Sequence, residues 1–224
     1  MTEQTKPRMI FDVDARAAWG AAFAAQRING RYIKQDEWAV NADGKEIPCN
    51  KELMIALLQE TSLIEQEDFS NGEKAREWFQ GQLFALLGDQ LNDFMKKAAE
   101  VSVKDMISLR VDSGMVACLP ATWLRASNKE RVADVIAESD SKHVGSVTEK
   151  IVRMVEVLDV MPGKTFTGWL VTVTDGNNLF RFCSSFEFKT GEAVRIQGKV
   201  KRHDSDRETG KPVTWLNYVK KLIQ

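Results

Sequence analysis

The hydrophobic periodicity of the chain changes near residue 143, and this change constrains the fold more than any single motif does. Before it, apolar residues recur at steps of three and four, as in Ala75, Trp78, Phe79 and Leu83. This is the spacing of a helix that buries one face. After it, apolar and polar residues alternate with a period of two, which is typical of half-buried strands. The sequence therefore predicts a helical first part and a β-rich second part.

The first part contains five segments with the periodicity of helices. Asn50 belongs to the residue types favoured at helix N-caps, and Gly30 is placed to end the first helix. The short apolar run 114–120, closed by Pro120, is interpreted as a strand or a buried turn. The expected helices are 14–29, 50–60, 70–90, 91–103 and 122–141.

The second part is expected to form five strands. The residues Asp175-Gly176-Asn177-Asn178 supply a turn between the second and third strands, because Gly and Asn tolerate positive φ. A polar loop over 204–212 precedes the last strand. Five strands with a tight turn and a polar loop at these positions are typical of a small, partly open antiparallel barrel. The expected strands are 147–160, two within 165–186, 193–203 and 213–223.

The two parts also differ in charge. Residues 143–224 hold 13 Lys+Arg and 9 Asp+Glu, a net charge of +4, whereas residues 1–142 hold 18 and 23, a net charge of −5. A contrast of this kind indicates two domains with different electrostatic tasks. We therefore expect an α-helical domain over 1–142 and a barrel domain over 143–224.

The barrel segment carries Asp175, Gly176 and Asn178 in its turn, the pair Ser184-Ser185 at the end of the next strand, and the strand "AVRIQGKVKRH". With these residues it resembles the OB-fold domains of phage-encoded single-stranded DNA-binding proteins. The resemblance implies an α+β fold class, with an α-helical N-terminal domain followed by a C-terminal five-stranded antiparallel OB-like β-barrel. The segments "NKELMIALLQ", "GEKAREWFQGQLF", "LNDF" and "MVACLP" are similar to the region that precedes the barrel in such proteins. The matching barrel residues are Gly145, Asp175, Gly176, Asn178, Phe180, Phe182, Ser184, Ser185, Gly191, Val194, Ile196, Gly198, Val200, Lys201, His203, Thr214, Leu216 and Val219.

An OB barrel that binds single strands uses cations to contact phosphates and flat side chains on which bases stack. The candidate cations are Arg181, Arg195, Lys199, Lys201, Arg202, Arg207 and Lys211. The candidate aromatic residues are Phe166, Trp169, Phe180, Phe182, Trp215 and Tyr218.

Each of these candidates has a competing structural explanation. Phe180 and Phe182 alternate with Arg181, so the two phenylalanines share a face that could instead fill the barrel core. Trp169 and Trp215 could lie in the core or on the surface. The cationic face of 193–203, with Arg195, Lys199 and Lys201, could bind phosphate or protect an edge strand from pairing with another chain.

Catalytic, metal and cofactor sites are not expected. His143 and His203 are far apart and have no metal-ligand spacing with a cysteine or carboxylate. No phosphate-binding, dinucleotide-binding, zinc-protease or nucleophile-elbow motif occurs. The three cysteines are expected to be reduced thiols in a cytoplasm, that of the host cell if the protein is phage-encoded. No signal peptide and no membrane span are expected.

These observations predict non-enzymatic binding of single-stranded nucleic acid, with DNA favoured and RNA left open, in phage DNA replication, recombination or repair. The sequence ends "YVKKLIQ", where many such proteins carry an acidic tail. Replication or recombination proteins are therefore expected to dock on the acidic helical half, whose other interpretation is a stabilising lid on the barrel. The alternative function is a protein-interaction adaptor or inhibitor that uses the barrel as a scaffold. Oligomeric state is left open.

Overall fold

The computed structural model describes residues 12–83, 92–163 and 167–222. The chain divides into two compact units, Met1–Arg125 and Ala126–Gln224, which we call the helical unit and the barrel unit. This division lies inside the long helix α6 (Ser113–Glu138), whereas the sequence placed the boundary at 142/143. The difference arises because residues 126–138 of α6 pack on the barrel, as described below.

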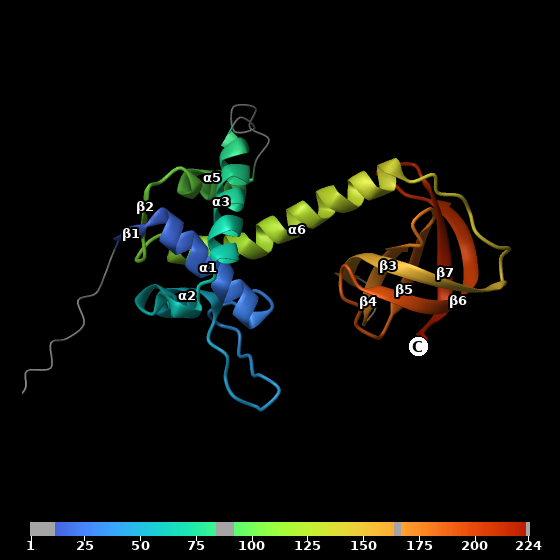
Figure 1. Ribbon diagram of the computed structural model, residues 1–224, viewed down its shortest axis with the longest axis horizontal. Helices are drawn as coiled ribbons and strands as arrows, with labels where there is room; N and C mark the ends of the chain where they lie inside the picture. Colours follow the sequence, from blue (N-terminus) through green and yellow to red (C-terminus); the bar gives the residue numbers. More distant parts are fainter. Residues whose placement is uncertain (1–11, 84–91, 164–166, 223–224) are drawn as a thin grey trace, which may run out of the picture. The chain divides into compact units, whose positions relative to one another are not determined.

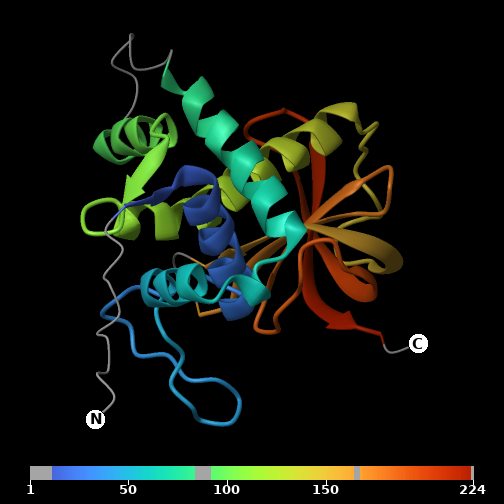
Figure 2. The ribbon, with the colours of Figure 1, turned by 60° about the vertical axis from the view of Figure 1, so that its left-hand side comes forward.

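The helical unit is built around the alanine-rich helix α1 (Figure 1). In Figure 2, α1 lies between α2 and α3. Helices α1 and α3 approach closely, since a Cβ added to Gly72 would stand 3.2 Å from the Trp19 carbonyl carbon and 3.3 Å from the Gly20 nitrogen. The elements of this unit are β1 (Asp12–Asp14), α1 (Ala15–Asn29), α2 (Asn50–Gln59), the short 3-10 helix η1 (Thr61–Leu63), α3 (Gln66–Gly81), α5 (Asp93–Ser102), β2 (Met106–Ser108) and the first half of α6.

Local capping explains where several of these helices begin and end. The Asp14 side chain accepts a hydrogen bond from the Ala17 N–H and starts α1, and Gly30 ends it in the left-handed conformation. Helix α3 ends at Gly81, and residues 84–90 of the helix expected over 70–90 lie outside the described residues.

The interpretation of 114–120 as a strand or turn is wrong, because these residues are helical within α6. Val116, Ala117 and Leu119 are buried in the core of the helical unit. The helix continues through Pro120, although proline lacks the N–H that would bond to the preceding turn. Tertiary packing outweighs this local cost.

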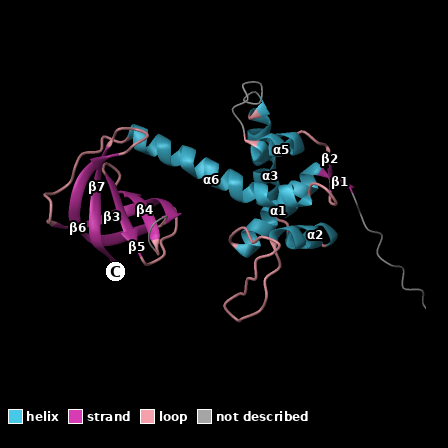
Figure 3. Ribbon diagram, turned by 180° about the vertical axis from the view of Figure 1, so that it is seen from behind, coloured by secondary structure: helices cyan, strands magenta, loops and turns pink. Residues whose placement is uncertain are grey.

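The barrel unit contains the expected five strands, closed into a barrel in the order β3-β4-β5-β7-β6 (Figure 3). The predicted α+β fold class is confirmed, and the topology is consistent with an OB-like fold. Two details differ from the expectation: the barrel is closed, and β5 and β7 are parallel. The parallel pair arises because β7 inserts between β5 and β6. The strands are β3 (Lys150–Pro162), β4 (Trp169–Thr174), β5 (Leu179–Ser184), β6 (Ala193–Ser205) and β7 (Pro212–Lys221).

The interior of the barrel is filled by alternate residues of every strand. Val171, Val173, Phe180, Phe182 and Leu216 are all essentially inaccessible to solvent, as strand alternation requires of one face.

The second half of α6 packs against the outside of the barrel. Ile136 is buried with Leu158, Leu179 and Val213. A β-bulge between Val157 and Asp159 interrupts the register of β3, and it directs Leu158 toward this cluster while Val157 stays in the barrel core. The hydrophobic contact explains why residues 126–138 belong to the barrel unit.

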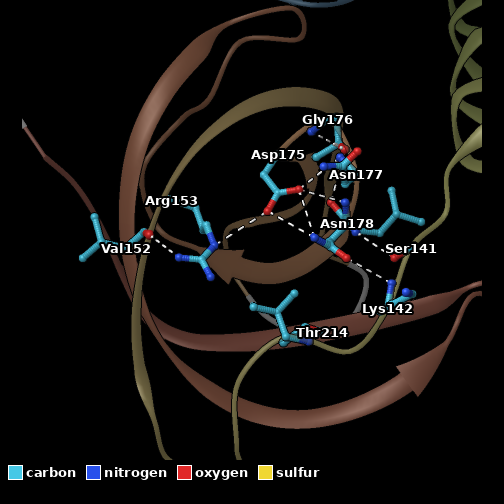
Figure 4. Close-up of polar contacts among 12 residues, drawn as sticks. Ser141, Lys142, Val152, Arg153, Asp175, Gly176, Asn177, Asn178 and Thr214 are labelled. Carbon is cyan, nitrogen blue, oxygen red and sulfur yellow. Dashed lines mark hydrogen bonds and ion pairs between the residues drawn. The ribbon is translucent and has the colours of Figure 1, made fainter.

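The segment after α6 is hydrogen-bonded to one end of the barrel (Figure 4). The Ser141 hydroxyl donates to the Pro212 carbonyl at 2.7 Å and accepts from the Leu179 N–H at 3.0 Å. The Lys142 N–H donates to the Asn178 side chain at 3.0 Å. Asn178 belongs to the predicted turn, which is confirmed: the Asp175 carboxylate accepts from the Asn178 N–H at 2.8 Å. These contacts hold together the neighbouring starts of β5 and β7.

Among the described residues, none of the helices combines the length and apolar composition that crossing a bilayer requires.

Candidate nucleic-acid interface

A continuous row of paired residues runs around the outside of the barrel. Its members follow one another across all five strands: Asp159, Thr172, Arg181, Trp215 and Arg202. Residues paired on neighbouring strands project to the same face of a sheet. The row therefore brings together three predicted site residues, Arg181, Trp215 and Arg202, which we call the arginine–tryptophan cluster.

The arginine–tryptophan cluster is largely engaged within the protein. The guanidinium carbon of Arg202 stands 4.6 Å from the centroid of the Trp215 ring, and that of Arg181 stands 5.9 Å away. Arg181 also donates to the Asp206 carboxylate at 2.9 Å and to the Thr172 hydroxyl at 3.2 Å. Stacking of a base on Trp215 would therefore compete with contacts that the fold already makes.

Asp206 fixes the loop that connects β6 to β7. Its carboxylate accepts hydrogen bonds from the backbone N–H of Glu208 at 3.1 Å and of Thr209 at 2.9 Å. Burial alone would raise the pKa of Asp206, but the hydrogen bonds from Thr209 and Arg181 outweigh it, and the net shift of this pKa is downward. Asp206 therefore stays ionised at neutral pH and neutralises Arg181.

The three cations predicted to share a face of β6 differ from Arg181 because no carboxylate among the described residues pairs with them. Arg195 and Lys201 are exposed and Lys199 is half-buried. Among the residues that the structure describes, none of the three forms an ion pair with a carboxylate. A β-bulge between Val200 and Arg202 interrupts the alternation, so Lys201 lies in the bulge and Arg202 stands beside Trp215. These positive charges remain available to an anion.

Strand β6 is not an edge strand. It is hydrogen-bonded to β3 on one side and to β7 on the other. The explanation that these cations protect an unpaired edge is therefore wrong for Arg195 and Lys199, which lie in the stretch paired with β3, since a stretch paired on both sides has no free backbone groups to protect.

The pairing of β6 with β3 reveals a further cation. Lys150 is exposed and stands opposite Lys199, and Met154 stands opposite Arg195. Two like charges directly opposite each other destabilise a sheet, so the Lys150–Lys199 pair favours a bound anion. We call Lys150, Arg195, Lys199 and Lys201 the basic face. The sequence analysis missed Lys150 because its neighbour across the sheet depends on the register of two distant strands.

Three of the other predicted aromatic residues, Phe180, Phe182 and Trp169, lie away from this surface. Phe180 and Phe182 fill the barrel core, the competing location, and present no ring surface to a base. Trp169 begins β4 and packs half-buried against the same core. Phe166 lies outside the described residues.

The two predicted cations of the β6–β7 loop differ from each other. Lys211 donates to the Ser139 carbonyl at 2.6 Å, which ties the loop to the end of α6. Arg207 is exposed and has no carboxylate partner within the described part of the chain. Of these two loop cations, Arg207 is the one whose charge has no partner among the described residues.

The described residues contain no group of three or more His, Cys, Asp and Glu side chains that could hold a metal ion. The rings of His143 and His203 are stacked, with centroids 4.5 Å apart, so the two distant histidines meet where the segment after α6 passes β6. No protein-family model matches the chain, and searches of curated proteins and of solved structures find no similar protein.

Proposed function

We propose that the barrel unit binds single-stranded nucleic acid, with DNA favoured, and that it does so without catalysis. The single observation that carries the proposal is the basic face. Its four cations lie on the neighbouring strands β3 and β6. None of them has a carboxylate partner among the residues described. Phosphates supply the counter-charge that this surface lacks. The OB-like topology supports the proposal, since such barrels present oligonucleotide-binding surfaces.

The resemblance to phage single-stranded DNA-binding proteins supports a role in phage DNA replication, recombination or repair. In this proposal, the barrel contacts the nucleic acid and the acidic helical unit serves as the platform for replication or recombination proteins. The net charges of the two sequence halves, −5 and +4, support the same division of tasks.

The test is a charge reversal on the full-length protein. We expect the triple variant Arg195→Glu, Lys199→Glu, Lys201→Glu to bind labelled oligo-dT at least about 100-fold more weakly at low salt, because attraction to several phosphates becomes repulsion. None of the three side chains is buried, and substitutions at such positions change stability little, so the variant should keep its circular dichroism spectrum. The matched control is Lys45→Glu, Lys74→Glu, Lys97→Glu, which reverses the charge of three exposed lysines in the helical unit. Equal loss of binding in the control would contradict the proposal.

One observation favours the second candidate function, a protein-interaction adaptor or inhibitor. Val152 and Met154 are exposed on the outside of β3, Met154 by 52%. An apolar surface of this kind also suits a protein partner. A full-length protein that fails to bind oligo-dT, duplex DNA and RNA at low salt would favour the adaptor over nucleic-acid binding.

A further inference from the structure

Tyr218 is the most exposed of the large apolar and aromatic residues in the described chain, with 82% of its surface accessible. It lies in β7, next to Asn217, and Asn217 is the direct neighbour of Lys199 across the sheet. The Tyr218 ring therefore stands at the border of the basic face. The sequence offered Tyr218 as a candidate for stacking but gave no means of telling it from the buried aromatic residues.

The backbone at Tyr218 explains why its ring points to solvent. The register between β6 and β7 shifts after Gln197, so two residues of β7 oppose Gly198. Tyr218 takes the left-handed conformation, with φ of +54°. A bulge of this kind re-aims a side chain. It leaves Leu216 and Val219 inside the barrel, where a Cβ added to Gly198 would stand 3.2 Å and 3.1 Å from them.

A second strained residue lies on the other side of β6. Thr148 has φ of +79°, which is unusual for a β-branched residue. Its N–H donates to the Val200 carbonyl at 2.8 Å. The two left-handed residues that are not glycine in the described chain, Thr148 and Tyr218, thus flank the stretch of β6 that carries Lys199. Backbone strain concentrates at functional sites, where the surrounding structure maintains it.

Three other aromatic rings of the barrel unit, those of Phe182, Phe188 and Trp215, have partners within the fold. Phe182 and Phe188 form an edge-to-face pair, and the Lys221 ammonium lies 4.3 Å from the Phe188 ring centroid. The Trp215 ring is covered by Arg202. Phe186 is also exposed, but it follows β5 and has no residue of the basic face as a strand neighbour. Tyr218 is therefore the ring best placed to receive a base.

Building on the proposed function, we infer that Tyr218 is a base-stacking platform and that the bound strand follows the outer surface of β3, β6 and β7. A base of the strand stacks on the exposed Tyr218 ring while neighbouring phosphates contact Lys199 and Lys150. The ligand class is an unpaired polynucleotide, because the bases of a duplex are stacked on one another and cannot cover the ring. The surface of β4 and β5, where Arg181 is neutralised by Asp206, is not the main path.

The test replaces Tyr218 with glycine in the full-length protein. Glycine adopts positive φ without strain, so Tyr218→Gly is expected to fold at least as stably as the natural chain. Its affinity for oligo-dT should fall roughly 5- to 150-fold, the range found when an aromatic stacking partner is removed. Tyr218→Phe keeps the ring and should retain binding. Trp38→Ala removes an exposed aromatic ring of the helical unit and serves as the matched control.

Two further readouts separate stacking from a general loss of structure. An abasic oligonucleotide of equal length has phosphates but no bases, so Tyr218→Gly should bind it as well as the natural protein does. The salt dependence of oligo-dT binding should be unchanged in this variant, because no charge is removed. If the natural protein binds oligo-dT and Tyr218→Gly binds it equally well, this inference is overturned while the proposed function stands. If the natural protein does not bind oligo-dT at low salt, both are overturned.

Discussion

The helical unit and the barrel unit use their charged side chains differently. In the helical unit, the buried carboxylates of Asp68 and Asp112 are paired with Arg27 and Lys104, both at 2.8 Å. On the basic face of the barrel, exposed cations stand beside each other, and the structure describes no carboxylate paired with them. Removing one partner of an ion pair inside the protein leaves an uncompensated buried charge, whereas like charges that stand together without a partner attract a ligand of opposite charge. The comparison predicts that substitutions in the two units should affect different measurements.

The largest effect on stability is expected from Arg27→Ala. This change leaves the Asp68 carboxylate, whose side chain is 5% exposed, without its main partner. We expect the free energy of unfolding to fall by about 2–3 kcal/mol, somewhat less than for a fully buried pair because Arg27 is partly exposed. Denaturant unfolding measures the loss. Oligonucleotide binding by the folded protein should not change.

The control for this prediction is Arg16→Ala. Arg16 pairs with Glu73 at 2.7 Å, but both side chains are more than half exposed, and exposed pairs contribute about 0–1 kcal/mol. A loss of stability in Arg27→Ala no larger than in Arg16→Ala would remove the distinction between the two kinds of charge.

A smaller effect is expected from Asp206→Asn, which tests a strongly paired charge on the outside of the barrel. The loss of the contacts to Arg181 and Thr209 should lower the free energy of unfolding by about 1–2 kcal/mol at pH 7. The folded pKa of Asp206 lies below its unfolded value. Its ionisation therefore stabilises the fold fully above the unfolded pKa of about 3.9 and stops doing so as pH falls through the folded pKa.

Urea unfolding at pH 7 and at pH 3 tests the direction of this pH dependence of stability. The difference in stability between the natural protein and Asp206→Asn should shrink as the pH falls below about 4. Asp204→Asn is the control, because Asp204 is exposed and pairs with Arg202 at a longer distance, 3.3 Å. A difference that stays constant or grows toward pH 3 would contradict the assignment.

The smallest effect is expected from Lys150→Gln, which tests the cation found only through the strand register. Because one exposed ion pair contributes about 0.5–1 kcal/mol, oligo-dT affinity should fall roughly two- to fivefold. The slope of log affinity against log salt should become shallower by about 0.7 for a single-stranded ligand. Lys189→Gln, an exposed lysine in the β5–β6 loop, should change neither value. Identical behaviour of the two variants would exclude Lys150 from the interface.

Local sequence patterns were sufficient to predict much of the fold. The period-two alternation and the Asp175–Asn178 turn are local features, and both lead to the observed strands. The alternation of Phe180, Arg181 and Phe182 showed that one of the two faces had to be the core. The path of α6 through Pro120 could not be predicted, because burial of neighbouring residues overrides the local signal.

The composition of the candidate site was harder to predict, because it depends on contacts between distant strands. The opposition of Lys150 and Lys199 follows from the register of β3 and β6. The exposed position of Tyr218 follows from a β-bulge that no local sequence pattern indicates. The pairing of Arg181 with Asp206 depends on the fold of the β6–β7 loop.

The account depends most directly on the basic face, and the salt dependence of oligo-dT binding tests it. If at least three of its four cations contact phosphates, log affinity for the natural full-length protein should fall with log salt at a slope of about −2 or steeper. In Arg195→Glu, Lys199→Glu, Lys201→Glu the slope should be shallower by about 2, in addition to the loss of affinity at low salt. Equal slopes for the two proteins, or no binding by the natural protein at low salt, would contradict the claim that these cations hold the strand.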